Sequence, residues 1–399
     1  MKSSKSNIQS PEEAKIAGLR DCFKEIGDLK FAALLFVSTC ILSARSCNLY
    51  RAADFAPVSG KRSHFRGNYA RLLRFFATGL GELLLLGVFR AVLRLALGSG
   101  KACCMAMDRT DWQSGGTWRN LLVIGLSFRG YLIPLVWVDI GHRGNSSVET
   151  RLALLDRLSA WWPADEVPLK TFPLVADREF GGEYWLLQIA KRGFAFVVRL
   201  KSNRQVPVWL NGWLRQKTAK LRTIRRYLQQ KGLKNIEIAI ADEYLCSLLC
   251  LPNSGTRDKD PYIYLLTNLD EPEAAGEFYQ LRWTIECCFG HLKSNGFDLE
   301  KQGFQHEHQV EIIMAVLVLL YTVCVLGGVL DEAQEVNSLP KVSVKKYANG
   351  KTCRQRSLFR LGLQKITAAI VLLKNGLLDI VNELLNCLSE FYTKTKFVV

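Results

Sequence analysis

The stretch "YQLRWTIECCFGHLKSNGF", residues 279–297, places a single carboxylate among basic side chains and a tyrosine. At about 100° per residue, four of its polar side chains fall within an arc of roughly 60° on one helix face. These four residues are Tyr279, Arg282, Glu286 and Lys293. We predict a helix that begins near Pro272, a residue suited to a first helical turn. An amphipathic helix with an incidental polar face is the alternative.

The size and charge of the chain narrow the choice of partner. A chain of 399 residues can form two or three domains, and 49% hydrophobic residues provide a sizeable core. The formal net charge of +16 favours a polyanionic partner. Such a partner is most often nucleic acid and less often an anionic membrane surface.

The positive charge is concentrated in acid-free stretches. Residues 184–236 contain 13 Lys or Arg residues and no acid, interleaved with Trp209, Trp213 and Tyr227. Basic groups next to aromatic rings suit phosphate contacts and base stacking, although a solvated basic face is the simpler alternative. Residues 341–374 form a further acid-free stretch with nine Lys or Arg residues.

The first 100 residues have long apolar stripes at helical spacing, which predicts a helical region. Within it, residues 55–81 contain no acid and five basic residues: Lys61, Arg62, Arg66, Arg71 and Arg74. This pattern is typical of a small helical DNA-binding region, and a helical bundle with a solvated basic face fits the composition equally well.

Two features bear on the cellular compartment. The segment 312–330 is uncharged and about long enough to span a bilayer, but we interpret it as a buried core helix. The twelve cysteines include no Cys-x-x-Cys pair, and residues 1–15 lack the apolar core of a signal peptide. We therefore expect reduced, mostly buried thiols in a cytoplasmic protein.

After residue 103 the pattern changes to short β-like runs. They are "LLVIGLSF", "LIPLVWVDIG", "FPLVADREF" and "FAFVVRLK", followed later by "IEIAIADEYLCSLLCLP" and "YIYLLTNLD". Between the second and third runs we predict a helix, with Ser146 or Ser147 as its N-cap. Strands mixed with helices predict a mixed α+β layer fold.

Acidic residues stand where two of the apolar runs end. Asp177 closes "FPLVA" and is followed by Arg178, and Asp108 closes "CCMAM" with Asp111 as its competitor. Enzymes that cut phosphodiesters with two divalent cations need carboxylates close to positive charge, and magnesium prefers oxygen ligands. An Asp that caps the next helix is the alternative for Asp177. Asp139, Asp242 and Glu243 are weaker candidates because no basic and aromatic cluster accompanies them.

Together these motifs resemble the DDE transposases of bacterial insertion sequences, in particular the group with the signature Tyr-x2-Arg-x3-Glu-x6-Lys. Tyr279, Arg282, Glu286 and Lys293 match that spacing without gaps. The resemblance extends from about residue 20 to about residue 365. It includes "DRTDW" at 108–112, "GHRGNSSVETR" at 141–151, "ADREFGGEYW" at 176–185, "LKSNGFDLE" and "RSLFRLGL".

The resemblance implies a site and a fold. Asp108, Asp177 and Glu286 would be the catalytic, metal-binding triad. Contacts to DNA would come from Tyr279, Arg282, Lys293 and Arg178. The fold would be α/β, mixed α+β, with a ribonuclease-H-like core and an N-terminal helical DNA-binding region.

The implied domains are a helical DNA-binding region over 1–100, a catalytic core over 101–310 and a helical region over 311–399. A mainly β insertion would occupy about 200–260 of the core. Relatives often stack a flipped base on an aromatic of this insertion, and four residues remain open for that part: Trp209, Trp213, Tyr262 and Tyr264.

The implied activity is metal-dependent cutting and joining of DNA. The enzyme would bind the terminal inverted repeats, cleave the element ends and transfer the 3′-hydroxyl strand into target DNA. It would use Mg²⁺, with Mn²⁺ able to substitute, and pair the ends as a homodimer in a synaptic complex. We expect a cytoplasmic, nucleoid-associated protein without a membrane partner. A catalytically inactive, transposase-derived DNA-binding protein is the alternative, and a membrane-anchored basic protein is the third.

Overall fold

The protein forms two compact units in a computed structural model. One unit joins residues 1–100 to residues 291–399, and the other comprises residues 101–290. The structure describes residues 18–57, 64–98, 102–114, 116–210, 213–253, 261–335, 344–346, 352–354, 356–372 and 376–384. The domain boundaries expected from the sequence lie near residues 100 and 310, whereas in the structure both ends of the chain contribute to one unit.

The unit of residues 101–290 is built on one mixed sheet with the strand order β3-β2-β1-β4-β5-β10-β9-β8. Its first strands are β1 (Ala102–Ser114), β2 (Thr117–Phe128), β3 (Tyr131–Asp139), β4 (Leu174–Ala176) and β5 (Phe196–Leu200). Strands β1, β2 and β3 form an antiparallel meander, and β4 and β5 continue the sheet parallel to β1. This mixed arrangement is the one expected of a ribonuclease-H-like core, so the predicted fold class is confirmed.

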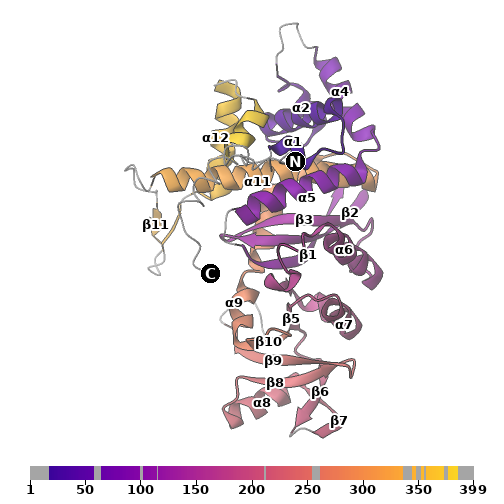
Figure 1. Ribbon diagram of the computed structural model, residues 1–399, viewed down its shortest axis with the longest axis vertical. Helices are drawn as coiled ribbons and strands as arrows, with labels where there is room; N and C mark the ends of the chain where they lie inside the picture. The colour runs from indigo at the N-terminus through magenta and orange to yellow at the C-terminus, as the bar shows by residue number, and fades with distance from the viewer. Residues whose placement is uncertain are drawn as a thin grey trace, which may run out of the picture. The chain divides into compact units, whose positions relative to one another are not determined.

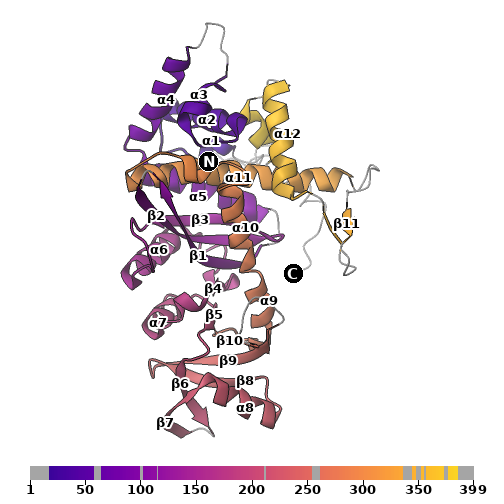
Figure 2. The ribbon, with the colours of Figure 1, turned by 180° about the vertical axis from the view of Figure 1, so that it is seen from behind.

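Helices lie on both sides of this sheet. They are α6 (Val148–Trp161), α7 (Glu183–Lys191), α9 (Ala275–Gln280) and α10 (Trp283–Leu292). Figure 1 shows α6 and α7 on one side of the sheet and α9 on the other, and in Figure 2 α10 continues from α9. Ser147 caps α6, because its hydroxyl accepts a hydrogen bond from the Thr150 amide at 3.1 Å. Ser146 and Ser147 were the two candidates for this N-cap in the sequence.

The segment between β5 and β10 contains mostly strands. It consists of β6 (Gln205–Leu210), β7 (Trp213–Lys220), α8 (Leu221–Lys231), β8 (Asn235–Ile240) and β9 (Tyr244–Pro252). Strands β6 and β7 form a separate hairpin, whereas β8 and β9 join the main sheet through β10 (Tyr262–Thr267). The basic stretch predicted from the sequence therefore lies mainly on the hairpin and on α8.

The other unit is mainly helical. Its elements are α1 (Leu19–Cys22), α2 (Asp28–Ala44), α3 (Leu49–Ala53), α4 (Phe65–Ala77), α5 (Gly81–Gly98), α11 (Glu307–Glu335), α12 (Leu358–Leu372) and the short strands β11 (Val344–Lys346) and β12 (Thr352–Arg354). Helix α11 packs against α5 and α12 (Figure 1). Residue Gly362 allows close packing of α12, because a Cβ there would overlap the Cys324 carbonyl of α11.

Helix α11 forms the core of this unit. It is the one helix among the described residues that is long and apolar enough to cross a membrane, and 94% of its most apolar window is buried. The prediction of a buried helix over 312–330 is confirmed. The cysteines that the structure describes are free and mostly buried, as predicted.

Candidate active site

The sheet places two of the predicted acids side by side. Strands β1 and β4 are parallel, and their register pairs Met107 with Ala176. The next residue on each strand is an aspartate, Asp108 on β1 and Asp177 directly after β4. Because the register brings the two carboxylates to neighbouring positions, acids 69 positions apart in the sequence share one site.

Helix α10 brings the third acid to the same place through an arginine. Arg282 Nη1 donates to Asp108 Oδ2 at 3.0 Å, and Arg282 Nη2 donates to Glu286 Oε1 at 2.6 Å. The Asp108 side chain is 21% exposed and that of Arg282 is 15% exposed. One guanidinium therefore bridges two of the three predicted metal ligands inside a largely desolvated site.

The signature stretch differs from the predicted continuous helix. Tyr279 belongs to α9, Glu286 belongs to α10, and Leu281 and Arg282 form the turn between these helices. The turn is held by short-range bonds, such as Leu281 N–H to the Phe278 carbonyl at 3.0 Å. The Thr284 hydroxyl also donates to the Leu281 carbonyl at 2.7 Å, which replaces a helical bond with a side-chain bond. The prediction of one uninterrupted helix is therefore wrong, although the side chains of Tyr279, Arg282 and Glu286 still converge on the acid site.

Tyr279 reaches the site because α9 packs on the sheet. Ala275 is buried against core residues of the strands, with Phe278 and Tyr279 packed beside it. The Tyr279 hydroxyl donates to Asp177 Oδ1 at 3.1 Å. Burial and the neighbouring carboxylate raise the pKa of Tyr279 to about 12, so the phenol stays protonated and remains a donor at neutral pH.

Burial also changes the ionisation of the first acid. Desolvation raises the pKa of Asp108 to about 6, and the nearby charges of Asp177 and Glu179 act in the same direction. The Arg109 amide, which donates to Asp108 Oδ1 at 2.8 Å, and the Arg282 guanidinium oppose that shift. A site that resists holding several negative charges together is one that a cation stabilises.

A second layer of charged residues connects the elements that carry the acids. Arg109 Nε donates to Glu179 Oε1 at 2.6 Å, and Arg151 Nη2 lies 3.6 Å from the same oxygen. Glu179 is in the short 3-10 helix η2 (Arg178–Phe180), and Arg151 also lies over the Phe180 ring. These roles were not predicted from the sequence, although both arginines and Glu179 lie inside the motifs quoted for the acids.

Arg178 and Lys293, both predicted to contact DNA, belong to different units of the protein. Arg178 is exposed and directly follows Asp177. Lys293 follows the end of α10 and belongs to the other unit, where its Nζ lies 3.1 Å from Glu300 Oε1.

The weaker acidic candidates have other surroundings. Asp111 is exposed on β1. Asp139 is fully buried, with its Oδ2 3.2 Å from Arg119 Nη1. Asp242 lies in the turn between β8 and β9, and the adjacent Glu243 pairs with Lys191 at 2.7 Å. Among these acids and the predicted triad, Asp108 and Glu286 are the two that accept hydrogen bonds from Arg282.

The aromatic candidates for base stacking differ in their exposure and in their contacts. Tyr264 is 1% exposed, so its ring is not available to a base in this conformation. The Tyr262 ring lies 4.2 Å from the Arg225 guanidinium. The side chains of Trp209 and Trp213 lie outside the described residues. Trp283, which was not among the candidates from the sequence, is 56% exposed and follows Arg282 directly.

The donor atoms of the three acids suit a hard divalent cation, because Mg²⁺ prefers carboxylate oxygens. In this conformation the carboxylates are not gathered around one point. Within the described part of the chain, no group of three His, Cys, Asp or Glu residues could hold a metal ion. The reason is local, since Arg282 stands between Asp108 and Glu286 and the Tyr279 hydroxyl binds Asp177.

Comparison with known proteins identifies the family. Residues 99–323, more than half of the chain, match the transposase DDE domain. The chain belongs to the DDE transposase family. No curated protein matches it. Among solved structures it is similar to a piggyBac transposase synaptic complex with hairpin DNA, with a TM-score of 0.42 and 10% identity over 90% of this chain and 82% of that one.

Membership confirms that the protein is a transposase, an enzyme class of DNA recombination that has DNA as its partner. DDE transposases generally use divalent metal ions, which agrees with the carboxylate donors of the site. The matched residues contain Asp108, Asp177 and Glu286, together with Tyr279, Arg282 and Lys293.

Proposed function

We propose that this transposase binds the terminal inverted repeats of a bacterial insertion sequence, cleaves DNA at the element ends and transfers the 3′-hydroxyl strand into target DNA. The signature Tyr279, Arg282, Glu286 and Lys293 supports the assignment to the insertion-sequence group. The cut and the transfer are both phosphodiester exchanges, which two carboxylate-bound divalent ions promote at one site.

One observation carries the proposal. The register of β1 against β4 sets Asp108 beside Asp177, and Arg282 links Asp108 to Glu286. Two acids that are distant in the sequence are thus neighbours on adjacent strands, and Arg282 connects the third acid to them. Carboxylates with strongly raised pKa values occur mainly at catalytic sites, so the pKa of about 6 for the partly buried Asp108 favours an enzyme over a protein that only binds DNA.

Asp108, Asp177 and Glu286 would hold Mg²⁺, with Mn²⁺ able to substitute. Metal binding would require the Arg282 guanidinium to leave the two carboxylates that it now bridges. The freed guanidinium would then be available to a DNA phosphate, which it binds through two parallel hydrogen bonds. The exposed side chain of Arg178, next to Asp177, is placed to contact the same strand.

Tyr279 and Lys293 complete the proposed DNA contacts. Tyr279 retains its proton at neutral pH and can donate to a phosphate oxygen after releasing Asp177. We further propose that the enzyme pairs two ends as a homodimer and acts in the cytoplasm on the nucleoid. Pairing follows from the reaction, because both ends of an element must be joined to one target.

The test uses a plasmid that carries this gene with its native flanking DNA. We expect the purified protein to cut at the element ends with Mg²⁺ and to leave the DNA intact with EDTA. Asp108→Ala, Asp177→Ala and Glu286→Ala should each abolish cutting while end binding persists in a gel-shift assay. Asp111→Ala is the matched control and should cut normally, because its side chain is exposed on the same strand.

The outcomes separate the alternatives. Loss of cutting in Asp111→Ala with normal cutting in Asp108→Ala would move the first metal ligand to Asp111. Cutting by all three alanine variants would disprove the mechanism. Binding without cutting by the wild-type protein would instead support a transposase-derived DNA-binding protein without catalysis.

A further inference from the structure

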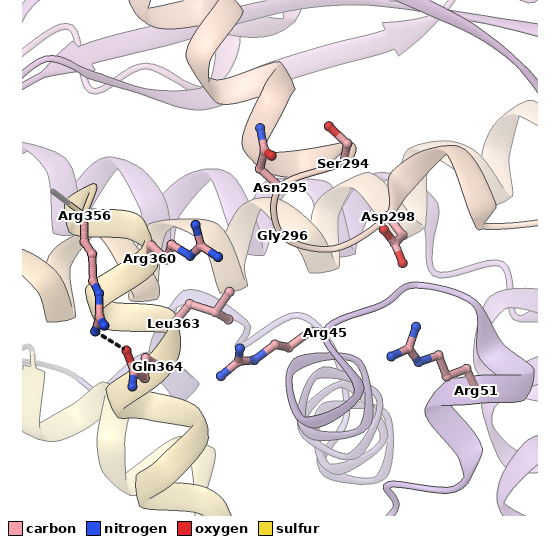
Figure 3. Close-up of a pocket in the computed structure, with 10 residues that line it drawn as sticks. All are labelled: Arg45, Arg51, Ser294, Asn295, Gly296, Asp298, Arg356, Arg360, Leu363 and Gln364. Atoms are coloured by element: carbon pink, nitrogen blue, oxygen red, sulfur yellow. Dashed lines mark hydrogen bonds between the residues drawn. The ribbon is translucent and has the colours of Figure 1, made fainter.

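Arginines from three separate segments surround a cavity in the unit formed by residues 1–100 and 291–399. The cavity has a volume of about 680 Å³. It is lined by Arg45 at the end of α2, Arg51 on α3, and Arg356 and Arg360 around the start of α12. Figure 3 shows the Arg45 and Arg360 guanidinium groups directed into the space beside the loop at Gly296.

The cavity has little negative charge to balance these arginines. Asp298 is the acid that lines it, and that carboxylate is already engaged with the Ser46 hydroxyl at 3.2 Å and with Lys301 at 3.5 Å. Within the described residues, neither Arg45 nor Arg360 forms an ion pair. Elsewhere in the same unit, Arg20 and Arg90 pair with Asp28 and Glu25 at 2.8 and 2.5 Å.

Two structural details hold these groups around the cavity. Arg45 adopts a left-handed conformation, with φ of 50°, as the C-cap of α2, where glycine is usual. Gly296 is fixed by close packing, because a Cβ there would overlap the His291 carbonyl and the Phe359 ring. The loop that this glycine belongs to also lines the cavity with Ser294 and Asn295.

Clustered, exposed guanidinium groups without acidic partners repel one another, and an anion removes that repulsion. Arginine forks match the geometry of phosphate oxygens, and hydroxyl and amide donors also bind phosphates. The cavity is polar and open at the surface, which suits a phosphodiester chain that passes along it better than a small apolar ligand.

We propose that this arginine cavity binds the DNA backbone, as a phosphate clamp separate from the acid site of the other unit. The inference rests on the proposed function for the identity of the polyanion. It adds a binding surface in a different unit, built from the loop after α10, the first turns of α12 with the preceding Arg356, and the helices α2 and α3 near the N-terminus. Such contacts position the duplex without reading its sequence.

The test measures binding to a fluorescein-labelled 40-base-pair duplex of arbitrary sequence, by anisotropy, in EDTA and at a series of KCl concentrations. The pocket variant is Arg45→Gln with Arg360→Gln. The control is Lys24→Gln with Lys30→Gln, which removes the same charge from exposed positions of the same unit. Thermal melts and circular dichroism establish that both double variants are folded.

We expect the pocket variant to bind the duplex roughly tenfold more weakly than the control variant at low salt. The slope of log affinity against log salt should also fall by about two, since each lost phosphate contact contributes about 0.9. Equal affinities and slopes for the pocket and control variants would overturn the inference. Because the assay contains no divalent metal, its result is independent of whether the wild-type protein cuts DNA.

Discussion

Two arginine–aspartate clusters on the same sheet are constructed in opposite ways. Arg119 and Asp139 are 2% and 0% exposed, and Asp139 Oδ1 also accepts from the Asn120 and Gly141 amides at 3.0 and 3.1 Å. At the candidate active site, Arg282 instead divides its guanidinium between Asp108 and Glu286. Each carboxylate of that site remains partly exposed.

The Arg119–Asp139 pair has the features of a structural ion pair, whereas the Arg282 cluster has the features of a site whose carboxylates can exchange arginine for another ligand. A buried carboxylate that accepts several hydrogen bonds from fixed donors loses stabilising interactions if it exchanges those donors for another ligand. At the active site the acids outnumber the guanidinium group that bridges them, and Asp108 resists ionisation. Exchange of that guanidinium for metal ions would relieve the excess of negative charge, whereas a metal at Asp139 would have to displace a complete set of bonds.

The largest effect should come from breaking the structural pair. Asp139→Asn should lower the free energy of unfolding by about 3–5 kcal/mol, because it leaves the buried Arg119 charge without its partner. Urea denaturation followed by tryptophan fluorescence measures the change. The control is Asp156→Asn, which removes an exposed pair with Arg192 and should cost less than about 1 kcal/mol. Equal costs for the two variants would contradict the structural role of Asp139.

A smaller effect should follow from weakening the layer behind the acids. Glu179→Gln keeps the size of the side chain but removes the charge that holds Arg109 and Arg151. We expect cutting to slow by about 10–100-fold, the equivalent of one charged hydrogen bond, with duplex binding unchanged. Single-turnover cutting of the element-end plasmid measures this rate.

The matched control for that layer is Glu183→Gln, which lies nearby and pairs with Arg204 at 3.1 Å with its side chain 42% exposed. It should slow cutting by less than about threefold, since an exposed pair contributes little. If both variants cut at the same rate, Glu179 has no special part in positioning the acids.

Asp108 and Asp177 could be chosen from the sequence because each stands at a marked position of its own element. Asp177 follows an apolar run that forms the buried strand β4, and Asp108 interrupts the apolar pattern of β1. Alternation and run length are local properties, so they can be read without knowing the fold. The resemblance to the transposases then ordered the three acids and implied the fold of the sheet.

What the sequence could not predict depends on contacts between distant segments or on competition within a turn. The break at Leu281 and Arg282 arises where helical spacing continues in the sequence but a Thr284 side-chain bond replaces part of the backbone pattern. Arg109 and Glu179 are 70 positions apart, and the arginine cavity draws on α2 and α12. No local pattern indicates which basic residues of an acid-free stretch will meet.

The smallest effect concerns the acid that resists ionisation. The pKa of Asp108 is about 6 in the folded state, against 3.8 for a free aspartate, so between these values the folded chain binds more protons than the unfolded chain. The free energy of unfolding therefore falls as pH rises from about 4 to about 6, and the loss persists above that range.

Asp108→Asn removes this titration. In EDTA, its stability relative to the wild type should increase by about 1–2 kcal/mol between pH 4.5 and pH 7.5. Thermal melts of both proteins at the two pH values measure the difference. A difference that did not change with pH would show that burial does not hold this carboxyl in its neutral form, and the contrast with Asp139 would then rest on hydrogen bonding alone.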